Sequence, residues 1–296
     1  MQKIFSHGYD KQSDDFLISK SLHGSEEALV ELISKHQNYI YNIAFEMVLS
    51  PFDAEDITQE VIIKVITKLG QYNGKSSFRT WLYKITVNHF LTMKKTWLEE
   101  RYPTFSHYEL ELENISDQDL SPSEQVEWSE LIEEARQGCL AGMLLCLTRE
   151  QRIVFILGEI FSVPHDIGAE IMSISKDNFR QRLKRSRNDL YHFMNKKCGL
   201  VNDDNPCRCP KKLKGFIREG WVDPTTLKFN VNYSNRIYQI VEEKDSKLKK
   251  MEYLNYKQLQ QDYSFQEKDF ISKVFKDLIQ SKMVKEVFEL SGSNDE

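Results

Sequence analysis

Basic and amide side chains crowd into residues 176–187, where they could bind DNA. The segment contains Lys176, Asn178, Arg180, Gln181, Lys184, Arg185 and Arg187. Lys and Arg neutralise phosphates, while Arg, Asn and Gln can hydrogen-bond to base edges in the major groove. A solvated basic helix is the alternative, because runs of charge also occur on exposed faces.

The residues around this segment favour the DNA-binding interpretation. A short helix is expected over 169–172, followed by a turn over 173–175 and a second helix that begins near Lys176. At helical spacing, Phe179, Leu183 and Leu190 would face a core and leave the cations outside. The pattern predicts a helix-turn-helix, which presents its second helix to the major groove.

A second set of polar side chains is interleaved with aromatic residues over 72–95. The candidate DNA contacts in it are Asn73, Lys75, Ser76, Arg79, Lys84, Asn88 and Lys94. Aromatic rings and cations together suit single-stranded DNA, since bases stack on rings and cations follow the backbone. Trp81, Leu82 and Ile85 recur at helical spacing and are therefore assigned to the core.

Cysteines form a candidate metal site after the second helix. His192, Cys198, Cys207 and Cys209 supply the imidazole and thiolate ligands that close tetrahedral zinc sites. The alternative is an ordinary His192 beside reduced loop thiols, because no C-x2-C pair is present. Cys139 and Cys146 lie in apolar helical segments and are predicted to be core residues. We expect that the protein requires no cofactor. If it binds a metal, the sequence indicates zinc or another metal at this loop.

The composition of the 296 residues restricts the function further. The net charge is -5, but acidic and basic residues are segregated along the chain, so local charge is the useful quantity. An odd number of cysteines without an export signal argues against a disulfide framework. No apolar run is long enough to span a bilayer, and we expect a cytoplasmic protein without membrane insertion. No nucleophile–base pair or phosphate loop indicates an enzyme.

Helical periodicity divides the chain. It holds over 25–95 and returns over 131–194, whereas the segment between them is acidic and broken by prolines. Asp53 is expected to cap the helix that follows Pro51. The expected organisation is a helical domain over 20–97, a mobile acidic linker over 98–134, a helix-turn-helix domain over 135–197, a Cys-containing loop over 198–224, and a mixed or helical extension over 225–296. The predicted fold class is therefore mainly α.

Three segments, in this order, resemble bacterial RNA polymerase sigma factors of the extracytoplasmic-function type. They are residues 54–61, 78–88 and 147–187, and the resemblance covers about 25–195. The first is similar to the region-two helix that docks on the polymerase beta-prime clamp, which would make Asp56, Gln59 and Glu60 polymerase-binding residues. The second is similar to the minus-ten recognition segment. The third is similar to region four, which reads the minus-thirty-five element and contacts the beta flap.

The resemblance implies a non-enzymatic protein of two helical domains that binds core RNA polymerase and promoter DNA and promotes DNA opening. An anti-sigma protein is a further candidate partner, and the acidic linker would thread towards the RNA exit path. Ser173 departs from the family pattern, since the turn usually has glycine there. The alternative function is a polymerase-independent helix-turn-helix regulator with a ligand- or metal-sensing tail.

Overall fold

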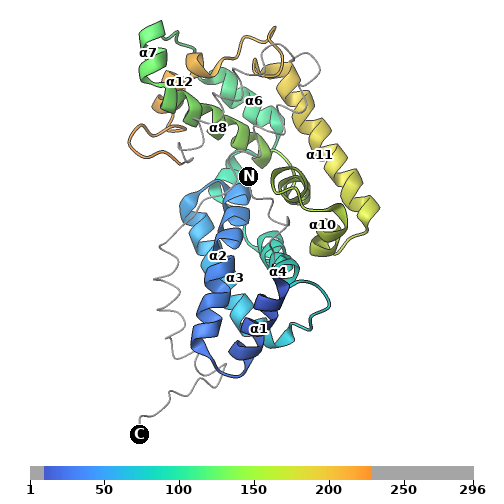
Figure 1. Ribbon diagram of the computed structural model, residues 1–296. Helices are drawn as coiled ribbons and strands as arrows, with labels where there is room; N and C mark the ends of the chain where they lie inside the picture. The colour runs from blue at the N-terminus through green and yellow to red at the C-terminus, as the bar shows by residue number, and fades with distance from the viewer. Residues whose placement is uncertain (1–9, 229–296) are drawn as a thin grey trace.

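Helices form nearly all of the regular structure in this computed structural model, which describes residues 10–228 (Figure 1). Within that range an isolated β-bridge pairs Cys198 with Cys207. The prediction of a mainly α fold is therefore confirmed. The predicted extension over 225–296 lies almost wholly outside the described residues. None of the helices in the described part of the chain is both long and apolar enough to cross a membrane.

The first four helices pack together at the N-terminal end of the described chain. They are α1 (Lys11–Leu22), α2 (Glu26–Val48), α3 (Pro51–Lys68) and α4 (Phe78–Thr92), with a short 3-10 turn, η1 (Leu69–Gln71), after α3. The predicted cap of α3, Asp53, was wrong: the Ser50 hydroxyl caps this helix and accepts a hydrogen bond from the Asp53 N–H at 3.3 Å. The reason is Pro51, which suits the first helical position, so the capping residue has to precede it.

The acidic segment 98–134 is folded, which corrects the prediction of a mobile linker. It contains α5 (Trp97–Arg101), α6 (Phe105–Asn114), α7 (Pro122–Glu127) and the start of α8 (Ser129–Leu145). Leu112 and Ile115 are buried in an apolar cluster that this segment shares with later residues of the chain. Distant lysines neutralise its acids, as Lys197 does for Glu113 at 2.7 Å. The acidic composition alone could not predict these apolar contacts, nor the lysines elsewhere in the chain that pair with the acids.

A helix also replaces part of the predicted Cys-containing loop over 198–224. This helix is α12 (Cys209–Arg218). Its Leu213 and Phe216 are buried in the same apolar cluster, and the Phe216 ring stacks on Trp221 with ring centroids 5.0 Å apart. The apolar residues of α12 are few and lie among lysines and arginines, so periodicity in the sequence did not predict this helix.

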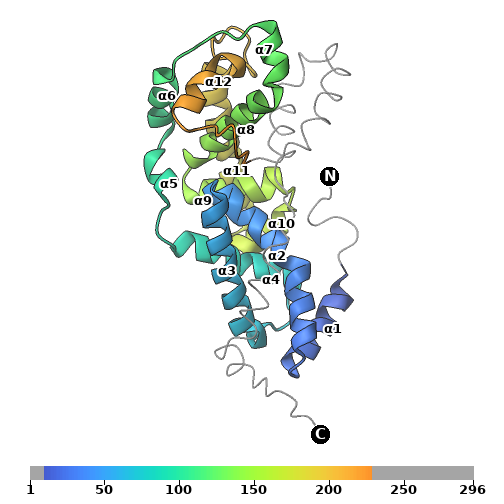
Figure 2. The same cartoon turned by 90° about the vertical axis from the view of Figure 1, so that its left-hand side faces the viewer.

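The predicted helix-turn-helix is formed by the elements that follow α8. They are α9 (Arg149–Phe155), a π-helical turn, η2 (Ile156–Ile160), α10 (His165–Met172) and α11 (Lys176–Lys197). Helix α10 packs against both α11 and α4. Figures 1 and 2 show α1–α4 at one end of the molecule, α6–α8 and α12 at the other, and α10 beside α4 where they meet. We call the arrangement in which α10 contacts α4 directly the closed arrangement.

Gly168 allows α10 to approach α11 closely. A Cβ at this position would lie 2.5 Å from Cζ of the fully buried Phe179 ring. We expect Gly168→Ala to lower the free energy of unfolding by about 1–3 kcal/mol, because the ring has no room to withdraw. Gly70→Ala is the matched control, since nothing lies within 4 Å of a Cβ added there. Urea denaturation measures both variants, and equal stabilities would contradict this packing.

Candidate nucleic-acid interface

Helix α11 turns one basic side to solvent. Its first turn is capped by Ser175, whose Oγ accepts a hydrogen bond from the Asn178 N–H at 3.2 Å. Phe179 and Leu183 are buried on the inner side. The exposed residues of the predicted set are Lys176, Arg180, Gln181, Lys184 and Arg185. Their spacing places them along one side of the helix, and we call them the basic face.

The turn before α11 has a strained residue. Ser173 adopts a φ of 55°, in the left-handed region that favours glycine. Its N–H donates to the Glu170 carbonyl at 3.1 Å, and the Ile174 N–H donates to the Ala169 carbonyl at 3.0 Å. The turn therefore has the backbone geometry in which glycine is usual, although serine occupies it.

Two other predicted DNA contacts on α11 have partners within the protein. Asn178 Oδ1 accepts a hydrogen bond from Arg182 Nε at 2.9 Å. Arg187 Nε donates to Glu159 Oε1 at 2.6 Å, and Glu159 is only 1% exposed. Arg187 thus compensates the charge of a buried carboxylate, whereas the side chains of the basic face are exposed to solvent.

His165 on α10 lies close to positively charged side chains of α11. The pKa of His165 is lowered by partial burial and then by the cations of Arg187, Arg180 and Lys176. The cations of α11 therefore lie close enough to α10 to act on His165. A positive potential attracts a polyanion such as DNA.

The loop before α4 is braced by aromatic contacts. Tyr72 Oη donates to the Ser76 carbonyl at 2.8 Å. The Tyr72 ring also packs edge-on against the rings of Phe78 and Trp81, with centroids 5.6 Å apart in each pair. These rings hold the loop in place, and they contact one another instead of standing free to stack on bases.

Exposure divides the predicted minus-ten residues. Asn73, Lys75, Asn88 and Lys94 are exposed, whereas Ser76 and Lys84 are half-buried. Arg79 differs from the prediction of a surface contact, because it is only 7% exposed. Its guanidinium lies 4.5 Å from the centre of the Tyr39 ring, a cation–aromatic contact that holds it within the bundle.

Helix α3 carries the predicted polymerase-binding residues on its outer side. Asp56 and Glu60 are exposed and Gln59 is half-buried. Phe52, one helical turn before Asp56, is 71% exposed. It was not predicted, although a large apolar residue on the solvent side of an amphipathic helix is a signal for a contact surface. Glu60 also lies 3.4 Å from Nε2 of His89 on α4.

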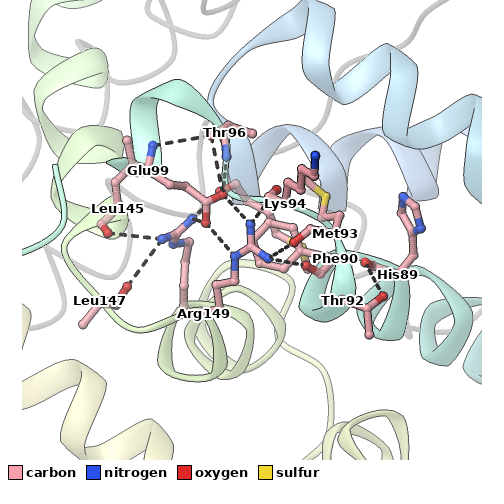
Figure 3. Close-up of polar contacts among 12 residues, drawn as sticks. His89, Phe90, Thr92, Met93, Lys94, Thr96, Glu99, Leu145, Leu147 and Arg149 are labelled. Atoms are coloured by element: carbon pink, nitrogen blue, oxygen red, sulfur yellow. Dashed lines mark hydrogen bonds and ion pairs between the residues drawn. The ribbon is translucent and has the colours of Figure 1, made fainter. Parts of the chain in front are cut away.

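A buried ionic network joins the two ends of the molecule around Glu99 (Figure 3). Glu99 is 4% exposed and accepts hydrogen bonds from Arg149 at 2.7 and 2.9 Å and from Arg152 at 3.0 Å. It also accepts from the Thr96 N–H at 3.0 Å, as half of a capping box that begins α5. Burial raises the pKa of Glu99, but the bonds and charges of these neighbours lower it below its ordinary value. Glu99 is therefore held as a carboxylate.

The two arginines of this network also bind backbone carbonyls at helix ends. Arg149 donates to the carbonyls of Phe90 and Met93, at 2.8 and 2.7 Å, where α4 ends. Arg152 is 2% exposed and donates to the Met47 carbonyl at 2.6 Å, where α2 ends, and to carbonyls where α8 ends. Carbonyls in the last turn of a helix lack partners within the helix, so the arginines satisfy them.

The predicted metal ligands are only partly brought together. One small cavity is lined by Cys139, Cys198, Cys207 and Cys209. His192 is exposed on α11 and does not line it. Burial, and then the nearby Cys198 and Cys207, raise the pKa of Cys209 to about 12. Cys139, which was predicted to be a core residue, therefore takes the place of His192 in this cluster.

Comparison with known proteins finds a family match within the first helices of the chain. Residues 32–96 match the Sigma-70 region 2 family, a range that includes all of α3 and α4. The ECF RNA polymerase sigma factor SigE of Mycolicibacterium smegmatis is 26% identical over 167 residues, 56% of this chain and 61% of that protein. The ECF RNA polymerase sigma-E factor of Escherichia coli is 28% identical over 181 residues, 60% of this chain and 92% of that protein. The chain is a homologue of ECF sigma factors.

Further similarities of this ECF sigma homologue are more distant or shorter. The RNA polymerase sigma-H factor of Pseudomonas aeruginosa is 33% identical over 78 residues, which span 26% of this chain and 40% of that protein. A solved structure of CnrH in complex with the cytosolic domain of CnrY aligns with a TM-score of 0.43 and 17% identity, over 62% of this chain and 98% of that one. The named relatives are transcription-initiation factors, which agrees with the prediction of a non-enzymatic protein.

Proposed function

We propose that this ECF sigma homologue binds core RNA polymerase, recognises promoter minus-ten and minus-thirty-five elements, and promotes DNA opening. The observation that carries the proposal is the combination, in one chain, of a Sigma-70 region 2 match with the basic face of α11. Region 2 would contact the polymerase clamp and minus-ten DNA, and α11 would enter the major groove at the minus-thirty-five element. The place of action would be the cytoplasm. Two further predictions rest on the resemblance to sigma factors alone: that the chain binds an anti-sigma protein, and that it contacts the polymerase beta flap.

In this proposal, promoter opening uses binding energy and no catalysis. The exposed side chains of the loop before α4, together with Asn88 and Lys94, would bind unpaired bases and their backbone. Each captured base stabilises the single strand relative to the duplex, so the equilibrium shifts towards the open state. The basic face would add an anchor on duplex DNA whose affinity falls as salt rises.

The closed arrangement has to open before both promoter elements can be bound. By their names the two elements lie about 25 base pairs apart, which is roughly 85 Å along B-DNA at about 3.4 Å per pair. In contrast, α10 contacts α4 directly, and Arg149 binds the carbonyls that end α4. We therefore expect polymerase binding to break the contacts that Arg149 makes with Glu99 and α4.

Charge reversal on α3 tests the proposed polymerase contact. The double variant Asp56→Lys, Glu60→Lys is expected to weaken binding to core RNA polymerase at least about 10-fold, because a like-charge contact at an interface costs several kcal/mol. Fluorescence anisotropy of the labelled chain titrated with core polymerase measures this affinity. Glu127→Lys is the matched control, since Glu127 is an exposed acid on α7, outside the region 2 match.

The same titration separates the proposal from its alternative. Equal affinities for the double variant and the Glu127→Lys control would contradict the docking face on α3. If the unaltered chain failed to bind core polymerase yet bound DNA, the polymerase-independent regulator would be the better account. Circular dichroism of each variant confirms that the helices are intact.

A further inference from the structure

Helix α12 binds the end of α6 through a buried lysine. Lys212 is 6% exposed, and its Nζ donates to the carbonyls of Leu112 and Ile115 at 2.9 and 2.6 Å. These carbonyls lie at the end of α6, where a helix has no donors of its own for them. The same Nζ lies 3.0 Å from the carboxylate of Asp117. A cation of α12 therefore caps a helix of the acidic segment.

The backbones of α12 and the acidic segment approach each other closely beside this lysine. The Gln118 N–H donates to the Lys211 carbonyl at 2.8 Å. A Cβ at Gly215 would lie 2.7 Å from the Ser116 carbonyl oxygen and 2.5 Å from Cγ2 of Ile115. Glycine permits this approach because it has no side chain to collide with the facing backbone. Any larger residue at position 215 would push α12 away from the end of α6.

Apolar side chains bury the rest of this contact. Leu112, Ile115 and Leu120 of the acidic segment lie in one buried cluster with Leu213 and Phe216 of α12. Figure 2 shows α12 beside both α6 and α8, and α12 packs against α8. Removal of α12 would expose the apolar side chains of the acidic segment to water, which is unfavourable. The folded form of the acidic segment therefore depends on α12.

The folded acidic segment shortens the connection between the two sets of candidate DNA contacts. One set lies before and on α4 and the other on α11, with the acidic segment between them along the chain. In the closed arrangement, residues 93–128 include the short helices α5, α6 and α7. Fully extended, they could span about 120 Å at about 3.3 Å per residue, which exceeds the roughly 85 Å between the promoter elements. Release of the acidic segment from α12 would therefore give the chain the reach that promoter binding needs.

We propose that α12 is an intramolecular latch, which holds the acidic segment folded in the free chain and releases it when the chain binds core RNA polymerase. The release rests on the proposed function, whereas the hold on the acidic segment does not. Helix α12 lies after the part of the chain that resembles sigma factors, so the latch is an addition to the sigma-like helices. The latch weakens the apparent affinity for polymerase, because only molecules with an open latch can bind it fully.

Hydrogen–deuterium exchange of the free full-length chain tests the hold on the acidic segment. Lys212→Met is expected to speed amide exchange over 105–120 at least about 10-fold, because the carbonyls at the end of α6 lose their buried donor. Gly215→Ala should speed the same amides without any change of charge. Lys211→Met is the matched control, since its side chain is 46% exposed and its pair with Asp119 lies at the surface. The control should change exchange by less than about threefold. Equal exchange in all four proteins would overturn the latch.

Binding to core RNA polymerase tests the release. Lys212→Met and Gly215→Ala are each expected to bind at least about threefold more tightly than the unaltered chain, whereas Lys211→Met should bind equally. In the unaltered chain, amide exchange over 209–218 should be faster in the holoenzyme than in the free protein, because α12 has lost its partner. If these amides were protected equally in both states, the release would be overturned.

The two measurements separate failure of the latch from failure of the proposed function. A chain that binds no core polymerase, but exchanges faster in Lys212→Met, would contradict the proposed function and the release while supporting the hold on the acidic segment. A chain that binds polymerase, with variants that neither exchange faster nor bind more tightly, would contradict the latch alone. Circular dichroism of each variant confirms that the other helices remain folded.

Discussion

Replacing Arg152 with methionine is expected to lower the free energy of unfolding by about 3–5 kcal/mol. Arg152 is 2% exposed and donates to the Glu99 carboxylate and to carbonyls that end α2 and α8. Methionine fills similar space but leaves the buried carboxylate with one fewer cation and leaves the carbonyls without donors. Urea denaturation followed by circular dichroism measures the difference between the two proteins.

Two related variants separate the buried charge from side-chain packing. Arg149→Met is expected to cost less, about 1–2 kcal/mol, because its side chain is 12% exposed and Glu99 would keep Arg152. Adding Glu99→Gln to Arg152→Met should restore part of the loss, since the buried carboxylate that has only Arg149 as its cation is then absent. A loss below about 0.5 kcal/mol in Arg152→Met would show that the network contributes little to the stability of the fold.

The triple variant Arg180→Ala, Lys184→Ala, Arg185→Ala is expected to weaken promoter binding at least about 100-fold, because contacts of this kind contribute about 1–3 kcal/mol each. All three side chains are exposed on the basic face. The holoenzyme formed with core polymerase is titrated onto a promoter fragment at several salt concentrations. The slope of log affinity against log salt should fall by about one for each phosphate contact that is lost.

Arg187→Met provides a contrast on the same helix. Arg187 is paired with the buried Glu159, so this variant should lower stability and leave the salt slope unchanged. If Arg187→Met weakened DNA binding more than the triple variant, the assignment of the basic face would be wrong. The comparison is made at a temperature where both variants remain folded.

Helical periodicity was sufficient to predict the helix-turn-helix and the outer side of α11. Phe179 and Leu183 are one turn apart and buried, so the 3.6-residue repeat leaves Arg180 and Lys184 outside. The motif order along the chain likewise indicated the family, because each segment keeps its own local pattern. Local sequence therefore predicted the elements and the exposed face of α11.

Contacts between distant segments could not be predicted in the same way. Glu99 and Arg149 are 50 residues apart, and the acidic composition assigned Glu99 to a mobile linker. Cys139 lies in an apolar helix, and nothing near it in the sequence marks it as a neighbour of Cys209. Arg79 is basic and was therefore placed at the surface, yet it lies over the ring of Tyr39. Each of these contacts depends on how helices pack, which periodicity in one segment does not contain.

Transcription in vitro with core RNA polymerase and genomic DNA tests the proposed function most directly. We expect the purified chain to direct core polymerase to discrete start sites that core polymerase alone does not use. The Asp56→Lys, Glu60→Lys variant should lose these transcripts, and Glu127→Lys should keep them. If no start site depended on the unaltered chain, while the chain bound DNA equally well with and without polymerase, the sigma-factor account would be contradicted.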